Sequence, residues 1–159
     1  MPLLERLSEV ERSTLLNYPA LEHDDAPSAP LRKPLSQATL AVVTTAGLHL
    51  RDDAPFRHGA PPDHTYRVIP SDTPPAEIVQ SHTSIGFDRT GVYRDLNVTL
   101  PLERVRELVA VGEVGALAPR VYSFLGAQRD PRRTADESAP EVARRLLDDG
   151  VDAVLLTPT

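Results

Sequence analysis

The end of the chain carries the feature that most constrains the fold, a helical pattern that leads directly into an apolar run. Residues 141–149 place apolar side chains one helical turn apart, and Gly150 is suited to end a helix. Residues 151–156 are mostly apolar and predict a buried strand. Ligands of open parallel sheets bind beyond the carboxyl ends of the strands, so we expect Thr157 and Thr159 to lie close to a substrate.

Three further segments predict strands of the same sheet. Residues 38–45 are apolar or β-branched on both alternations, which fits a central strand covered on both faces. Residues 114–124 predict another strand, in which Pro119 indicates a bend or a late start. Residues 66–69 predict a short edge strand.

Helical patterns occupy residues 2–17, which we expect to pack on the sheet, and residues 101–111. Residues 48–62 are expected to form a loop, and residues 77–79 a short helix or strand. Strands that alternate with helices predict an α/β fold, and we expect a three-layer α/β/α sandwich with a mostly parallel sheet.

Length and proline content predict one main domain with an appended segment. The chain has 159 residues and 16 prolines, which favours a single core with long irregular connections. We expect an N-terminal helix over residues 1–18, a Pro-rich linker over 19–37 and an α/β domain over 38–159.

The charge balance disfavours nucleic acid and membrane partners. Seventeen Lys and Arg side chains against 23 Asp and Glu give a net charge of -6. A negative protein has no general attraction to phosphate backbones or anionic lipids. No apolar run approaches the roughly 18 residues of a membrane span, so we expect a cytoplasmic protein.

The polar centre of the sequence is residues 81–97, and it supplies the candidate site. His82 is a candidate acid or base near neutral pH, with Asp88 as its orienting partner. Arg89 and Arg94 are candidates for binding a carboxylate. The alternatives stay open that His82 is a structural histidine and that the arginines only pair with nearby aspartates.

Metal, thiol and nucleotide chemistry have little support in the residues. The chain has no cysteine, which excludes thiol catalysis and thiolate metal ligands within it. His49, His58, His64 and His82 are spaced unlike any compact zinc site, so we expect no metal. No nucleophile elbow, phosphate-binding loop or dinucleotide motif is present in the sequence.

Five sequence blocks, in order along residues 39–159, resemble the glycine/sarcosine/betaine/D-proline reductase family of the selenoprotein B type. The blocks are LAVVTTAGLHL, HTYRVIPSDT, SHTSIGFDRTGVYRDLNVTLPLERVREL, GALAPRVYSFLGA and APEVARRLLDDGVDAVLLTPT. Members of that family continue after a strand like VDAVLLTPT with a redox-active selenocysteine or cysteine. The resemblance therefore implies such a residue just after Thr159, and no cofactor within the chain itself. The sequence would stop there because a selenocysteine codon was taken as a stop, because it is a piece of a longer protein, or because this relative is naturally short.

The resemblance also implies a reaction and partners. The family reductively cleaves a carbon–nitrogen bond of a small amino acid or betaine-like substrate and works with partner subunits. On that basis we expect His82 to assist the departing nitrogen, with Asp88 orienting it. Substrate binding would fall to Arg89, Arg94, Asn97, Thr157 and Thr159.

A second hypothesis keeps the same fold without the redox centre. The chain would then be a small-molecule-binding or subunit-assembly module. On either hypothesis we expect a homodimer, because an uncovered apolar run at residues 151–156 would leave a sticky surface.

Overall fold

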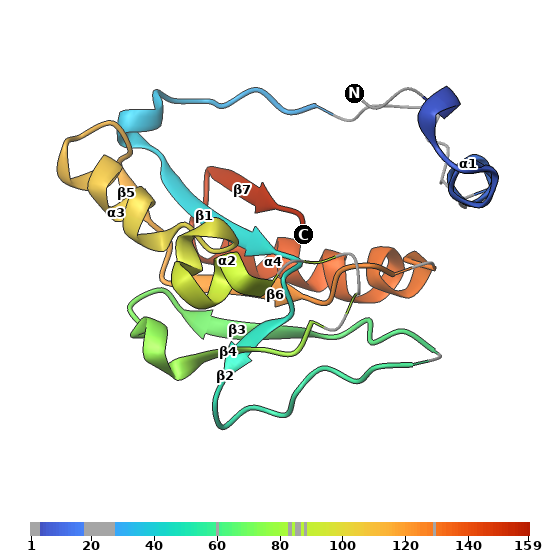
Figure 1. Cartoon of the computed structure of the whole chain (residues 1–159). Coiled ribbons are helices and arrows are strands. Elements are labelled where there is room, and N and C mark those ends of the chain that lie inside the picture. Colours follow the sequence, from blue (N-terminus) through green and yellow to red (C-terminus); the bar gives the residue numbers. More distant parts are fainter. Residues whose placement is uncertain are drawn as a thin grey trace.

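The structure is a computed structural model that describes residues 4–17, 28–59, 61–82, 84, 87, 89–128 and 130–159 (Figure 1). Its α-helices are α1 Glu9–Leu16, α2 Arg89–Arg94, α3 Leu102–Ala110 and α4 Ala139–Asp148. Its strands are β1 Thr39–Thr44, β2 Leu48–Leu50, β3 Tyr66–Pro70, β4 Ile78–Gln80, β5 Ala116–Leu117, β6 Arg120–Phe124 and β7 Ala153–Thr157. Short 3₁₀ turns and a π-helical turn over Thr134–Ser138 complete the described secondary structure.

Strand β1 is the centre of a five-stranded sheet (Figure 1). It pairs in parallel with β5 and β6 along one edge and with β7 along the other. Strand β3 pairs with β6 antiparallel and forms the outer edge on that side. The sheet is therefore mostly parallel, and the predictions of an α/β fold and of an edge strand near residue 66 are confirmed.

The strand predicted over residues 114–124 is split by a break at Pro119. Thr39 is paired with Ala116, whereas Val43 is paired with Tyr122. Between these two pairs, the segment of β5 and β6 advances six residues while β1 advances four. Proline has no N–H to donate to the ladder, so the two extra residues fall where the sequence predicts a bend.

Helices cover both faces of the sheet because the side chains of β1 alternate between two cores. Val42 belongs to a core that also contains Leu102 and Val105 of α3. Ala41 belongs to a second core with Val142 and Leu146 of α4. Burying an aliphatic side chain of this size stabilises a fold by roughly 1.5–3 kcal/mol, so both helices are held mainly by these contacts.

A small second sheet, missed by the sequence analysis, decides where the polar segment begins. Strands β2 and β4 pair antiparallel, with Leu48 opposite Gln80 and Leu50 opposite Ile78. The expectation of a loop at residues 48–50 was wrong, since three residues are too few to show an alternating pattern. Gly47 makes the turn out of β1 with a φ of +66°, a backbone conformation that favours glycine.

Two expectations about burial were also wrong. Helix α1 buries none of its residues, so it does not pack on the sheet; its capping box between Ser8 and Glu11 supports it locally. Strand β7 lies at the edge of the sheet, and Leu156 is 67% exposed, because among the described elements only β1 pairs with it. The prediction of a strand at this place is confirmed, while the prediction that it is buried is not.

Within the described residues, no helix is long and apolar enough to cross a membrane. The linker expected over residues 19–37 lies partly outside the described residues, which resume at residue 28.

Candidate functional site

The carboxyl ends of β1, β6 and β7 meet at one edge of the sheet and are joined by backbone hydrogen bonds. The N–H of Gly126, just after β6, donates to the carbonyl of Thr45 at 2.8 Å. The N–H of Thr45 donates to the carbonyl of Thr157 at 3.3 Å, and the N–H of Thr159 donates to the Thr45 hydroxyl at 2.8 Å. This is the edge at which parallel α/β sheets bind ligands.

The small sheet of β2 and β4 brings His82 to this edge. The N–H of Ser81 donates to the carbonyl of Gly47 at 2.9 Å, which keeps the chain beside the turn after β1. A Cβ built on Gly126 would lie 3.1 Å from His82 Nε2 and 2.6 Å from the carbonyl oxygen of Thr159. His82, Gly126 and Thr159 therefore come together although they are far apart in the sequence.

The His82 ring is buried and has one unpaired nitrogen. Its residue is 2% exposed, and its ring packs against that of Phe87 with centroids 4.9 Å apart. The backbone N–H of Ser84 donates to Nδ1 at 3.2 Å, so Nδ1 is the acceptor of the ring. In the neutral ring the proton is then on Nε2, and Nε2 has no hydrogen-bond partner among the described residues.

The surroundings of His82 disfavour its charged form. Burial lowers the pKa of His82 below its ordinary value, and the positive charges of His58 and Arg89 lower it further. The ring is therefore neutral at pH 7. A buried donor without a partner costs about 1–3 kcal/mol, and in native proteins such groups usually have a reason. The atom lies at the carboxyl edge of the sheet, which makes it a candidate donor to a ligand.

The predicted arginines lie at the two ends of α2. Arg89 begins the helix, is exposed and acts electrostatically on His82. Arg94 ends the helix, about 7.5 Å further along its axis, and is exposed as well. Asp88, the proposed orienting partner of His82, lies outside the described residues. Of the two arginines, Arg89 is the one that contributes to the lowered pKa of His82.

Asn97 and Thr157 have their polar groups engaged in the fold. The side chain of Asn97 accepts from the N–H of Glu103 at 3.1 Å and donates to the carboxylates of Asp95 and Glu103, which holds the start of α3. The hydroxyl of Thr157 donates to the carbonyl of Thr99 at 2.8 Å. Asn97 therefore supports the start of α3 and Thr157 the segment before it, and a role of either side chain in substrate binding stays a prediction.

Gly126 and Ser84 are the site residues that sequence reasoning missed. Gly126 follows a strand directly, which is a weak signal for close approach of backbone or ligand. Ser84 contributes only its backbone N–H, and a main-chain group has no signal in the sequence.

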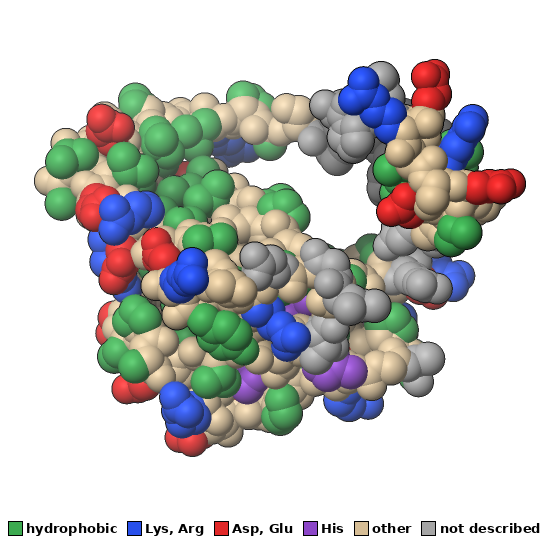
Figure 2. Space-filling view, viewed as in Figure 1, with side chains coloured by type: hydrophobic (Ala, Val, Ile, Leu, Met, Phe, Trp, Pro, Cys, Tyr) green, Lys and Arg blue, Asp and Glu red, His purple; other side chains and the backbone are tan. Residues whose placement is uncertain are grey.

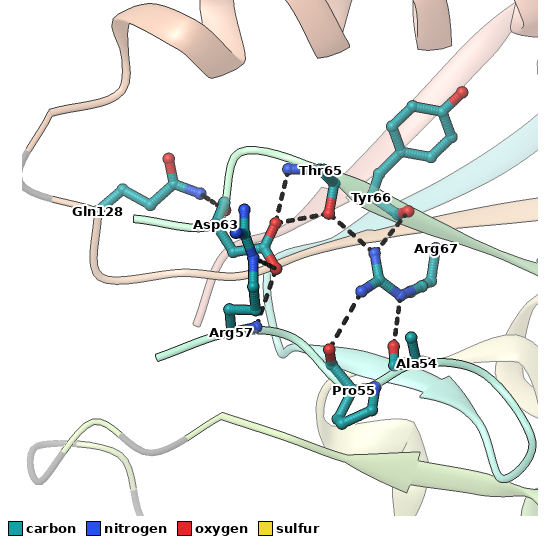
Figure 3. A network of polar contacts seen from close by, with 8 residues as sticks. All are labelled: Ala54, Pro55, Arg57, Asp63, Thr65, Tyr66, Arg67 and Gln128. Atoms are coloured by element: carbon teal, nitrogen blue, oxygen red, sulfur yellow. Dashed lines mark hydrogen bonds and ion pairs between the residues drawn. The ribbon is translucent and has the colours of Figure 1, made fainter. Parts of the chain in front are cut away.

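A buried carboxylate stabilises the loops next to this edge (Figure 3). Asp63 accepts hydrogen bonds from the N–H of Arg57 at 2.9 Å and from both the N–H and hydroxyl of Thr65. Its carbonyl accepts from the side chain of Gln128 at 2.8 Å, which ties this loop to the segment after β6. Burial by itself would raise the pKa of Asp63, but the bonds from Thr65 and Arg57 and the charge of Arg67 lower it overall.

The histidines considered as metal ligands are separate. Both ring nitrogens of His49 are engaged, one with the Ser81 hydroxyl at 2.6 Å and the other with the carbonyl of Leu50 at 2.7 Å. His64 pairs with Glu137 at 3.3 Å. In the part of the chain that the structure describes, no three potential ligands gather to hold a metal ion.

Figure 2 shows histidine side chains close to basic side chains on one face of the molecule. A mostly parallel sheet with helices on both faces defines an α/β protein, and His82, whose Nε2 has no partner among the described residues, lies at the carboxyl edge of that sheet. The family model described as glycine/sarcosine/betaine reductase selenoprotein B matches residues 1–159, and the chain belongs to this family.

Curated relatives are named as subunits of reductases. The chain is 39% identical over 128 residues to D-proline reductase subunit gamma of Acetoanaerobium sticklandii, which covers 80% of the chain and 51% of that protein. It is 31% identical over 144 residues to the sarcosine reductase complex component B subunit beta of Peptoclostridium acidaminophilum, covering 89% of the chain and 33% of that protein. It is 31% identical over 159 residues to the betaine reductase complex component B subunit beta of the same organism, covering 99% and 36%. The chain therefore spans about half the length of the first relative and about a third of the other two. No solved structure gives a significant match.

Proposed function

We propose that this chain forms part of a reductase that cleaves the carbon–nitrogen bond of a small amino acid or betaine-like substrate at the carboxyl edge of its sheet. The names of its relatives support the reaction class, since they are D-proline, sarcosine and betaine reductases. The observation that carries the proposal is the buried Nε2–H of His82, which has no partner among the described residues and lies beside Gly126 and Thr159.

The reaction needs two electrons and two protons besides the substrate. For D-proline, the bond between Cα and the ring nitrogen breaks, Cα gains a hydrogen and the nitrogen becomes a primary amine, which gives 5-aminopentanoate. A dithiol supplies the electrons and is oxidised to a disulfide. Thiols of this kind stay reduced in the cytoplasm, where we place the protein.

We propose that a selenocysteine or cysteine follows Thr159 and supplies the nucleophile for this cleavage. The geometry near Thr159 supports this placement, because its N–H is held by the Thr45 hydroxyl at the edge where β1 and β7 end. His82 is neutral there, so it binds the substrate as a hydrogen-bond donor and does not protonate the departing nitrogen. Arg89 contributes positive charge that attracts the substrate carboxylate.

The reductase proposal is tested by reading the gene beyond codon 159 and by assaying its full product. We expect a selenocysteine or cysteine codon directly downstream. The full product, combined with its native partner subunits and dithiothreitol, is expected to form 5-aminopentanoate from D-proline, or to release ammonia from glycine, methylamine from sarcosine or trimethylamine from betaine. A replacement of the downstream residue by serine is the matched control and should abolish turnover. A continuation without selenium or sulfur at this site would overturn the proposed mechanism.

Strand β7 favours a second function, assembly with other subunits. Val154, Leu155 and Leu156 are 40%, 38% and 67% exposed, so both faces of this edge strand present apolar side chains. Exposed apolar strands at a sheet edge are sites of association. We propose that β7 contacts either a second copy of the chain or a reductase partner subunit.

Co-purification from the native host tests the assembly role directly. A wild-type chain is expected to retain a partner that a Leu156→Lys variant loses, whereas Val10→Lys, on the exposed helix α1, is expected to retain it. Equal retention by both variants would count against assembly through β7.

A further inference from the structure

We propose that His82 and Gly126 form a carboxylate-binding subsite, in which the Nε2–H of His82 donates to a carboxylate oxygen of the ligand once the Thr159 carbonyl, which borders Gly126, moves aside. This inference rests on the function proposed above and names the group of the substrate that His82 recognises.

The hydrogen bond from Ser84 fixes which ligand atoms His82 can bind. Because Nδ1 accepts the Ser84 N–H, the neutral ring presents only a donor at Nε2. An ammonium group has donors alone and cannot satisfy this atom, whereas a carboxylate oxygen can. The departing nitrogen of a protonated amino acid is therefore a poor partner for His82, and its carboxylate is a good one.

The local charge favours an anion at the same place. Arg89 acts on His82 as a positive charge. Its effect opposes a second proton on the ring and attracts a negative group to it. A hydrogen bond between an N–H and a charged carboxylate is also stronger than one to a neutral carbonyl.

Gly126 is required at this position because of space. Its backbone is not among those with positive φ, so the main chain does not itself demand a glycine. A Cβ there would lie 2.6 Å from the carbonyl oxygen of Thr159, 2.9 Å from that of Thr45 and 3.1 Å from His82 Nε2. Such a Cβ would occupy the approach to the only unpaired donor described at this edge.

Thr159 borders the subsite, and we expect this residue to move when a ligand enters. It is exposed, and its hydrogen bonds to described residues are with the Thr45 hydroxyl, one of 2.8 Å and one of 3.4 Å. By contrast, Gly126 is fixed by a backbone bond to Thr45, and His82 by its buried ring. A ligand is therefore expected to enter where the chain leaves β7.

The binding test uses three ring compounds that differ in one group each. D-proline carries a carboxylate and an amine, cyclopentanecarboxylate only the carboxylate, and pyrrolidine only the amine. The protein, with ¹⁵N-labelled histidine and a short Gly-Ser extension so that no terminal carboxylate lies at Thr159, is observed by NMR at pH 7.5 without reductant. We expect His82 to be protonated on Nε2, and its Nε2–H signal to shift with the two carboxylates and not with pyrrolidine. An equal response to pyrrolidine, or protonation on Nδ1, would overturn the subsite.

Variants of His82 separate hydrogen bonding from packing. His82→Phe keeps a ring but removes the donor and is expected to weaken cyclopentanecarboxylate binding at least 10-fold. His82→Gln keeps an N–H donor and is expected to bind within about 3-fold of wild type. Unchanged binding by His82→Phe would overturn the proposal.

A substitution of Gly126 tests whether a side chain at this position obstructs the approach to His82 Nε2. Gly126→Ala is expected to weaken carboxylate binding at least 10-fold, whereas Gly91→Ala, whose Cβ would meet only Val98 at 3.7 Å and 3.9 Å, is the matched control. If Gly126→Ala does not fold, the His82 variants decide. Because no turnover is measured, failure of the reductase assay leaves this result standing. If wild type turns over substrate and His82→Phe binds the carboxylate as well as wild type does, the reductase proposal stands and the subsite proposal is wrong.

Discussion

Thr44 and Thr157 are register partners on β1 and β7, and both hydroxyls donate to the same carbonyl oxygen, that of Thr99, at 3.0 Å and 2.8 Å. Thr99 is 2% exposed and precedes α3. The two hydroxyls therefore join the carboxyl ends of two parallel strands to the segment that leads into a covering helix. Without them, a buried carbonyl would lose its partners at the edge where the site is built.

Replacing Thr157 by valine is expected to lower stability without affecting ligand binding. Valine has the shape of threonine but cannot donate to Thr99, so we expect a loss of about 1 kcal/mol in the free energy of unfolding. Thr157→Ser, which keeps the hydroxyl, is the control. Urea unfolding measures the change, and NMR titration with cyclopentanecarboxylate measures binding. A loss of binding without a loss of stability would indicate that Thr157 contacts the ligand.

Asp63 is expected to stabilise the fold at neutral pH and not in acid. Its pKa is lower in the folded protein than in the unfolded chain, so the unfolded chain takes up the proton first as pH falls. Its contribution is present above the ordinary carboxyl pKa and is lost as pH falls through the lowered value. Asp63→Asn is expected to cost about 1–3 kcal/mol at pH 7, since it leaves donors of Arg57 and Thr65 poorly paired.

Unfolding by urea at pH 7 and at pH 3 checks this expectation. The gap between wild type and Asp63→Asn should narrow at the lower pH. Asp72→Asn, on an exposed residue before η3 (Pro75–Glu77), serves as the control and should show little change at either pH. An equal gap at both pH values would mean that the ionisation of Asp63 is not involved.

His82 is expected to make the fold less stable as pH falls below neutral. Its pKa is lowered in the folded state, so below the ordinary value of 6.5 the unfolded chain binds a proton that the folded chain does not. Stability is then full above pH 6.5 and falls by up to about 1.4 kcal/mol per pH unit until the pH reaches the lowered pKa. His82→Gln does not titrate and should show a flatter profile between pH 6.5 and pH 5. Parallel profiles would show that the folded and unfolded pKa values of His82 are equal.

The sheet could be predicted from sequence where the pattern was long or interrupted by proline. Residues 38–45 are apolar on both alternations and became β1, buried on both faces, and Pro119 marks the break between β5 and β6. Strand β2 has only three residues, which is too short for a period to show. The exposure of β7 depends on which elements pack against it, and that is a property of the tertiary fold.

The candidate site could be predicted in part, because the chemistry of a side chain can be read from the sequence but its surroundings cannot. His82 was chosen for its chemistry, and the structure places it at the carboxyl edge. Its lowered pKa depends first on burial, and the place of its proton depends on a backbone N–H of Ser84, and neither can be read from residue types. Asn97 is a candidate as a polar residue of the segment 81–97, but its amide holds the start of α3, and sequence alone does not distinguish a binding from a structural use.

Leu156 is expected to control association of the chain. It is 67% exposed on an edge strand whose neighbours Val154 and Leu155 are also exposed, so a second copy could bury apolar side chains there. At tens of micromolar we expect wild type to sediment as a dimer. Leu156→Lys should be a monomer, because a lysine at the centre of the contact would have to bury its charge. Leu147→Lys, at a 75% exposed position on α4, is the control and should remain a dimer. A monomeric wild type would leave the partner subunit as the proposed occupant of β7, and a dimeric Leu156→Lys would exclude this strand as the self-association surface.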